Sequence, residues 1–77
     1  MRRVAALLLL AALAAAQAEE IARLRSQHPA ERRKAALTLA GLGRAALDAV
    51  PALEKAARDD DQGVAGAARK ALKRING

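Results

Sequence analysis

Apolar residues recur at helical spacing in four segments of the chain, and no segment alternates with the period of two that is typical of a strand. In the last segment, for example, Val64, Ala68, Leu72 and Ile75 are spaced by four, four and three residues. The pattern predicts an all-α chain with helices over about residues 19–25, 30–41, 46–58 and 62–75.

Turn-forming residues separate these segments. Pro29 suits the first turn of the second helix, and Gly43 follows its last apolar residue, where helices commonly stop. Pro51 interrupts the third segment, so we expect a short turn first and a regular helix from Pro51 onward. One acid of the run 59–61 is expected to cap the last helix.

The apolar pattern repeats along the chain. A shift of 33 residues places Ala35 on Ala68, Leu39 on Leu72 and Leu42 on Ile75. The same shift aligns residues 26–28 with residues 59–61, the two turns before the matching helices. A recurring apolar face is what stacked helix pairs require, so the pattern predicts a short α-solenoid of antiparallel helix pairs.

The N-terminus has the three parts of a secretory signal peptide. Arg2 and Arg3 form a positive start, residues 4–16 are thirteen uninterrupted apolar residues, and small residues occupy positions 16 and 18 before two glutamates. The apolar run is shorter than the roughly 20 residues that span a bilayer. We therefore expect residues 1–18 to be a signal peptide cleaved after Ala18, and the domain of residues 19–77 to be periplasmic or secreted.

Two other interpretations of this segment stay open: an uncleaved amphiphilic anchor, which would be the chain's membrane contact, and a buried first helix of the fold. Lipoprotein attachment is excluded because the chain has no cysteine.

Candidate chemistry is sparse. Without cysteine and with one histidine, His28, the chain has no convergent metal ligands. The acids 59–61 lack the spaced ligands of an EF-hand loop, and two hydroxyls, Ser26 and Thr38, have no motif of a catalytic nucleophile. The sequence therefore predicts no enzyme, no cofactor and no metal, and a turn or capping role for His28.

Among the features of the composition, only the charge bears on what the protein binds. The formal net charge is +6, and loss of Arg2 and Arg3 would leave +4. Basic residues crowd the second and last helices largely opposite their apolar stripes, which is typical of a solvated face or of a cationic surface for an anionic partner. The candidate surface comprises Arg32, Arg33, Arg69, Lys70, Lys73 and Arg74.

Residues 50–75 resemble the short HEAT-like repeat of the type named after phycobilin lyases. That pattern opens one helix with V-P-x-L, continues with an acidic D-x-D turn, and ends with V-R-x-x-A-A-x-x-A-L-x-x-I. The matching positions are Pro51, Leu53, Asp59, Asp61, Val64, Ala68, Ala71, Leu72 and Ile75, and upstream Arg32, Ala35, Leu39, Leu42 and Gly43.

The chain departs from this pattern at several positions. The helix arginine is present as Arg32 but is replaced by Ala65 in the second copy, and Glu31 stands where valine is expected. In such repeats the acids of one turn commonly pair with the arginine of a stacked neighbour. The resemblance therefore implies that Arg32 reaches Asp59 or Asp61.

The repeat architecture, the predicted export and the absence of candidate chemistry together favour an exported scaffold or module of about one and a half to two repeats that binds a protein partner. The alternative is a basic-surface binder of nucleic acid, acidic protein or anionic lipid; the absence of aromatic residues for base stacking disfavours nucleic acid. Solenoids generally need at least three repeats. A marginally stable monomer, a self-associating unit and a part of a longer repeat protein therefore all stay open.

Overall fold

The computed structural model describes the backbone of residues 2–77 and the side chains of residues 12–77. Its elements are α1 (Arg2–Arg23), α2 (Pro29–Leu42), a 3-10 helix η1 (Gly43–Ala49), α3 (Val50–Ala56) and α4 (Gln62–Asn76). The described backbone contains no strand, which confirms the predicted all-α fold class.

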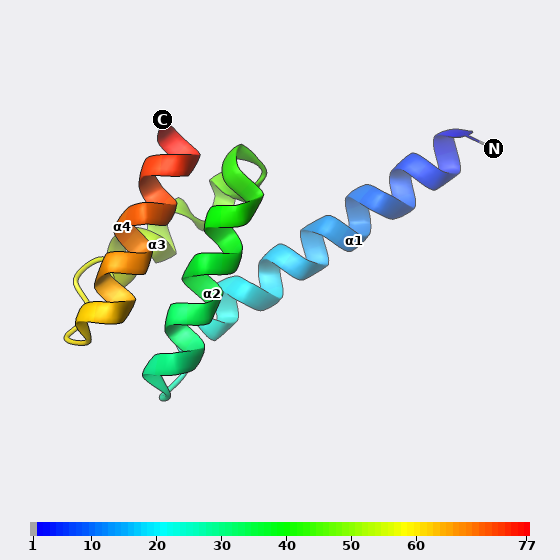
Figure 1. Cartoon of the computed structure of the whole chain (residues 1–77). Helices are drawn as coiled ribbons and strands as arrows, with labels where there is room; N and C mark the ends of the chain where they lie inside the picture. The colour runs from blue at the N-terminus through cyan, green and yellow to red at the C-terminus, as the bar shows by residue number, and fades with distance from the viewer. Residues whose placement is uncertain (1) are drawn as a thin grey trace.

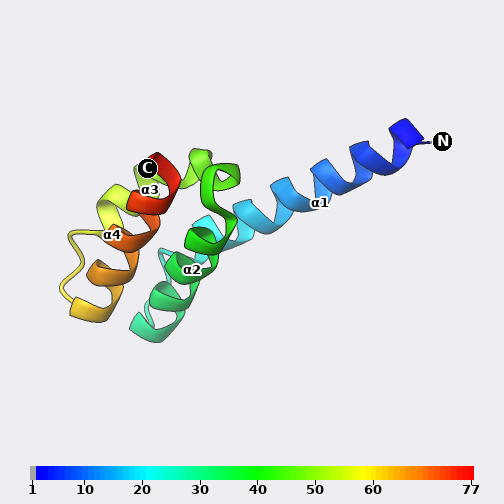
Figure 2. The ribbon, with the colours of Figure 1, turned by 45° about the horizontal axis from the view of Figure 1, so that its top comes forward.

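The helices form two layers. In Figures 1 and 2, α2 and α4 lie side by side and run in the same direction, while α3 and the end of α1 lie on the other side of the bundle. The end of α1 with α2, and α3 with α4, are thus two antiparallel helix pairs stacked on each other. This is the short α-solenoid that the 33-residue repeat predicts.

α1 is longer than the helix expected over residues 19–25, because it begins at Arg2 and ends at Arg23. Figure 1 shows it projecting from the bundle, which it reaches only with its last turns. Among the described side chains, residues 12–16 are exposed and Gln17 is the first buried one. The side chains of Arg2, Arg3 and residues 4–11 of the expected signal peptide lie outside the described residues.

The core lies between the two layers and is small. Its largest fully buried side chains are Leu39, Leu53, Val64 and Ile75, and alanines fill most of the remaining space. Because an alanine side chain adds little bulk, the helices approach each other closely and each large residue carries much of the apolar burial.

The turn between α2 and α3 follows from two residues. Gly43 ends α2 with φ 57°, and its N–H donates to the carbonyl of Ala40. Pro51 sits in the first turn of α3, where its missing N–H needs no partner. Since its ring would clash with the carbonyl four residues earlier, the chain takes the 3-10 path of η1 before Val50. The third segment is therefore not one helix over 46–58, and the turn expected before Pro51 is η1.

By length and composition, Pro29–Ala56 is the one stretch among the described residues apolar enough to cross a membrane. The structure divides this stretch into α2, η1 and α3, with the chain turning at Gly43. Leu39 of α2 and Leu53 of α3 are fully buried within the bundle. Part of its hydrophobicity therefore serves the core of the domain, while Leu37 and Leu47 are exposed.

Two glycines near this turn should respond oppositely to alanine. Gly43→Ala is expected to destabilise the domain by about 1–3 kcal/mol, because φ 57° with ψ −135° is a backbone conformation that side chains strain. Gly41→Ala should stabilise it by roughly 0.5–1 kcal/mol, since Gly41 lies inside α2 with nothing within 4 Å of an added Cβ. Urea denaturation of both variants measures the difference; changes of the same sign would contradict this account.

Candidate interaction surfaces

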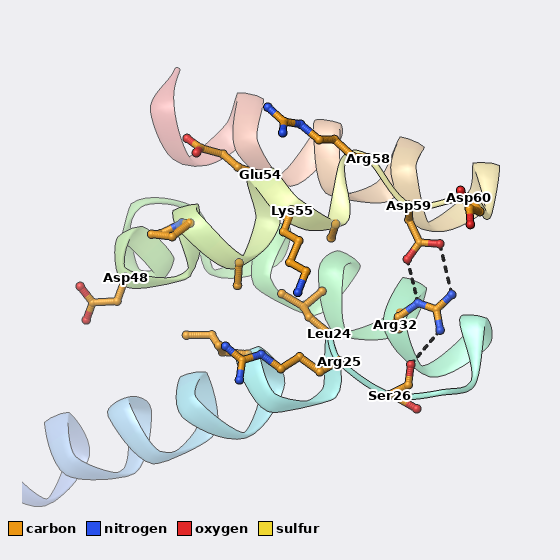
Figure 3. A pocket seen from close by; sticks show the side chains of 14 residues that line it. Leu24, Arg25, Ser26, Arg32, Asp48, Glu54, Lys55, Arg58, Asp59 and Asp60 are labelled. Atoms are coloured by element: carbon orange, nitrogen blue, oxygen red, sulfur yellow. Dashed lines mark hydrogen bonds and ion pairs between the residues drawn. The ribbon is translucent and has the colours of Figure 1, made fainter.

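An ion pair joins the two repeats. Arg32 lies on α2 and Asp59 lies in the turn before α4, and their side chains are 19% and 14% exposed. The guanidinium donates from Nε to Asp59 Oδ2 at 2.8 Å and from Nη2 to Asp59 Oδ1 at 3.1 Å. Its Nη1 also donates to the Ser26 carbonyl at 2.7 Å, so one side chain ties both turns together (Figure 3). This geometry confirms the pairing implied by the repeat pattern.

The acidic turn caps α4. Asp61 Oδ1 accepts from the Val64 N–H at 2.9 Å, which confirms the expected cap. Asp59 Oδ1 accepts from the Asp61 N–H at 2.9 Å, so the carboxylate that binds Arg32 also shapes the turn. Two of the three acids therefore have structural roles in the turn.

The ion pair between Arg32 and Asp59 shifts the pKa values of both groups. The hydrogen bonds from Arg32 and from the Asp61 backbone hold the pKa of the Asp59 carboxyl below its ordinary value, against the opposing effect of desolvation. The hydrogen bond to Asp59 raises the pKa of the Arg32 guanidinium. Both groups are thus charged at neutral pH, and the contact is a charge-assisted, bidentate one.

The histidine and the two hydroxyl residues considered for catalysis or metal binding form hydrogen bonds with residues close to them in the sequence. His28 is the exposed residue before α2, and its backbone N–H donates to Ser26 Oγ at 3.1 Å. The Ser26 hydroxyl donates to Glu31, and the Thr38 hydroxyl donates to the Lys34 carbonyl at 3.0 Å. These contacts stay within the turn before α2 or within α2 itself, so they build local structure.

A groove of about 1080 Å³ lies between the end of α1 and α3. It exists because α1 reaches the bundle only with its C-terminal end, where Ile21 and the following Leu24 contribute to the lining, so that the side of α3 turned toward α1 is partly uncovered. Ala52 and Ala56 of α3 contribute to its apolar lining.

Two cations face this groove. In Figure 3, the side chain of Lys55 extends from α3 toward Leu24, and that of Arg25 lies along the opposite wall. Asp48, Glu54 and Arg58 point away from the space between them. The lining of the groove also includes acids, Asp60 among them. Arg25 and Lys55 nevertheless stand on opposite walls of the apolar floor, and this arrangement suits a segment carrying apolar and acidic side chains.

The sequence did not indicate this groove. Arg25 and Lys55 are thirty positions apart in the chain, outside any motif, and only the divergence of α1 from α3 brings them to one groove. No periodicity or spacing in the sequence would have found it.

The six residues predicted to form a basic surface are not all available for one. Arg32 does not belong to an exposed cationic surface, because its guanidinium is taken up by Asp59 and the Ser26 carbonyl. The other five are exposed: Arg33 on α2, and Arg69, Lys70, Lys73 and Arg74 on α4. Lys34, which was not among the six, is exposed beside Arg33.

The two repeats differ on the sides where a further repeat would stack. On α2, Ala36 and Ala40 are buried beside the apolar stripe. The residues at the equivalent positions of α4, 33 residues later, are Arg69 and Lys73, and both are exposed. On α4, Ala67 and Ala71 are buried on the opposite side of the stripe. The residues at the equivalent positions of α2 are Lys34 and Thr38, and both are exposed. Each helix thus buries small residues toward the other and carries polar residues on its outward side.

Two stacked antiparallel helix pairs, tied by a bidentate arginine–aspartate contact between their turns, define an α-solenoid repeat protein. The sequence profile of HEAT repeats matches residues 18–77, and the chain belongs to this family. No curated protein and no solved structure matches the chain. HEAT repeats commonly mediate protein–protein interaction and are typically non-catalytic.

Proposed function

We propose that this protein is an exported HEAT-repeat module of the phycobilin-lyase type that binds a protein partner, without catalysis, in the groove between α1 and α3. The observation that carries the proposal is the groove itself: an apolar floor from Leu24, Ala52 and Ala56, with Arg25 and Lys55 on opposite walls. A protein segment with an acid between apolar side chains would satisfy both the floor and the two cations.

Four observations support export with removal of residues 1–18. The described side chains of residues 12–16 are exposed, and the HEAT-repeat match begins only at residue 18. The buried Gln17 has no hydrogen-bond partner for Nε2 among the described residues, so its loss would remove an unfavourable group. Cleavage after Ala18 would also leave Glu19 and Glu20 at the start of the helix, where the dipole favours acids.

The proposal is tested by photocrosslinking in the cells that make the protein. A photoreactive amino acid at Ala52, in the groove, is expected to capture one specific protein, and mass spectrometry of the product should show a chain that starts at Glu19. The matched control carries the same group at Thr38, which is exposed on the outer side of α2. Arg25→Glu with Lys55→Glu should abolish capture from Ala52, because both walls then repel an acidic segment.

Capture of the same proteins from Ala52 and Thr38 would refute binding in the groove. Capture from Ala52 that survives the double charge reversal would refute the acidic character of the partner. A captured chain that still begins at Met1 would refute cleavage and leave the groove in place.

A further inference from the structure

Cations cover the side of the α2–α4 layer that faces away from the core. We call this surface the outer face and define it by the exposed residues Arg33, Lys34 and Leu37 on α2 and Lys70, Lys73 and Arg74 on α4. Arg69 is exposed as well, but its Nη2 donates to the Ala57 carbonyl at the end of α3 at 3.5 Å, so it is not part of this face. The α4 residues recur at spacings of three and four, so they form one stripe along the helix. The two stripes share one surface, since α2 and α4 lie side by side (Figure 2).

Acids are nearly absent from this face. α4 contains four cations and no acid. The single acid of α2 is Glu31, and it accepts a hydrogen bond from Ser26 at the turn. Among the described side chains, none of the five cations of the outer face forms an ion pair; the acids that do are Glu19, Glu20 and Asp59.

Helix stability does not account for this arrangement. The dipole favours Lys73 and Arg74 in the last turn of α4, but it gives no such stabilisation to Arg33 and Lys34, the fifth and sixth residues of α2. The pairs Arg69–Lys73 and Lys70–Arg74 place like charges four residues apart, which destabilises an isolated helix. An anionic partner would compensate for this repulsion.

The exposed Leu37 favours a lipid surface over other anionic partners. It is 41% exposed and stands beside Arg33 and Lys34, at the position that corresponds to Lys70 in the other repeat. An apolar side chain among cations is suited to a lipid surface, because the cations meet the headgroups while the leucine enters the apolar boundary. A nucleic acid would be expected to use stacking aromatic residues, and the sequence has none.

We propose that the outer face of α2 and α4 binds the surface of a membrane rich in anionic lipid. The face is remote from the groove between α1 and α3, so the domain would hold a protein partner on one side and lie on a membrane with the other. Each cation near an anionic surface strengthens binding by about fivefold, and salt weakens that contribution. The proposal does not depend on the groove or on cleavage of residues 1–18.

The test compares full-length variants in sedimentation with vesicles of phosphatidylglycerol and phosphatidylcholine, and with vesicles of phosphatidylcholine alone. Lys70→Gln, Lys73→Gln and Arg74→Gln together should weaken binding to the anionic vesicles on the order of a hundredfold. The matched control neutralises Arg25, Lys55 and Arg58, none of which lies on the outer face, and should lose less than about tenfold. Since α1 is the same in every variant, its own affinity for lipid cancels.

A second pair of variants isolates the apolar contribution. Leu37→Gln should weaken binding to anionic vesicles about fivefold, and this loss should persist at high salt. Leu47→Gln, at a residue that is 58% exposed on η1, should have no effect. Circular dichroism checks that each variant keeps its helices.

Equal losses in the two triple variants would overturn the proposal, because net charge and not the outer face would then govern binding. Equal affinity for the two vesicle types would overturn it as well. Tighter binding to an oligonucleotide or to polyglutamate than to anionic vesicles would assign the face to a polyanion or an acidic protein instead. Groove variants that lose their crosslinked protein but keep vesicle binding would separate this proposal from the proposed function.

Discussion

Leu39→Ala is expected to lower the stability of the domain by about 2–5 kcal/mol and its Tm by on the order of 15 °C. Leu39 is fully buried and is one of four large side chains with that burial among residues 12–77. A domain of about 60 residues has roughly 3–9 kcal/mol of stability in all. Loss of a single leucine should therefore remove a large part of it, and the surrounding alanines cannot rearrange to fill the space.

Thermal melting followed by circular dichroism, at several protein concentrations, measures this effect. Leu47→Ala is the matched control, because Leu47 is 58% exposed and its truncation should change stability by less than about 0.5 kcal/mol. A concentration-independent melt of the unmodified chain would show that two repeats suffice as a monomer. Equal destabilisation by the two substitutions would mean that the core between the two layers does not hold the domain together.

Arg32→Ala should be nearly as damaging, with Tm lowered by on the order of 10 °C. The substitution leaves the Asp59 carboxylate, which is 14% exposed, without its bidentate partner and frees the Ser26 carbonyl. Arg33→Ala removes the same charge from the adjacent, exposed position and should leave the Tm within a few degrees. If both variants melt alike, the contact between the turns does not stabilise the stack.

The pH dependence provides an independent measurement of the same contact. Because the folded-state pKa of Asp59 is lower than its unfolded value of about 3.9, the stabilisation is present above that value and is lost as the pH falls through the folded pKa. Melts between neutral pH and about pH 2 should therefore show a steeper acid loss in the unmodified chain than in Arg32→Ala. Parallel curves would contradict the assignment.

Local rules predicted much of the fold. The spacing of apolar residues located the helices, Gly43 marked the end of α2, and the acidic turn supplied the cap of α4 through Asp61. These features depend on contacts within a few residues, which the sequence shows directly. The pairing of Arg32 with Asp59 was also predicted, since a repeated pattern places equivalent turns side by side.

The surfaces could not be predicted in the same way. Arg32 and Arg33 are adjacent and chemically identical in the sequence, yet one is committed to Asp59 and the other is exposed. The groove depends on the direction in which α1 leaves the bundle, and this brings Arg25 and Lys55 to its two walls. Neither fact is encoded within one helix.

The sequence by itself determined the all-helical class, the two repeats and the turn chemistry, because periodicity and capping act over one or two helical turns. Only the tertiary structure decided which side of α2 meets α4, and therefore why Ala36 and Ala40 are buried while the equivalent Arg69 and Lys73 face solvent. The physical reason is that a repeat pattern specifies the core-facing stripe of each helix. Which residues beside that stripe are buried is decided only when the helices pack, since each helix then has a neighbour on one side and a free surface on the other.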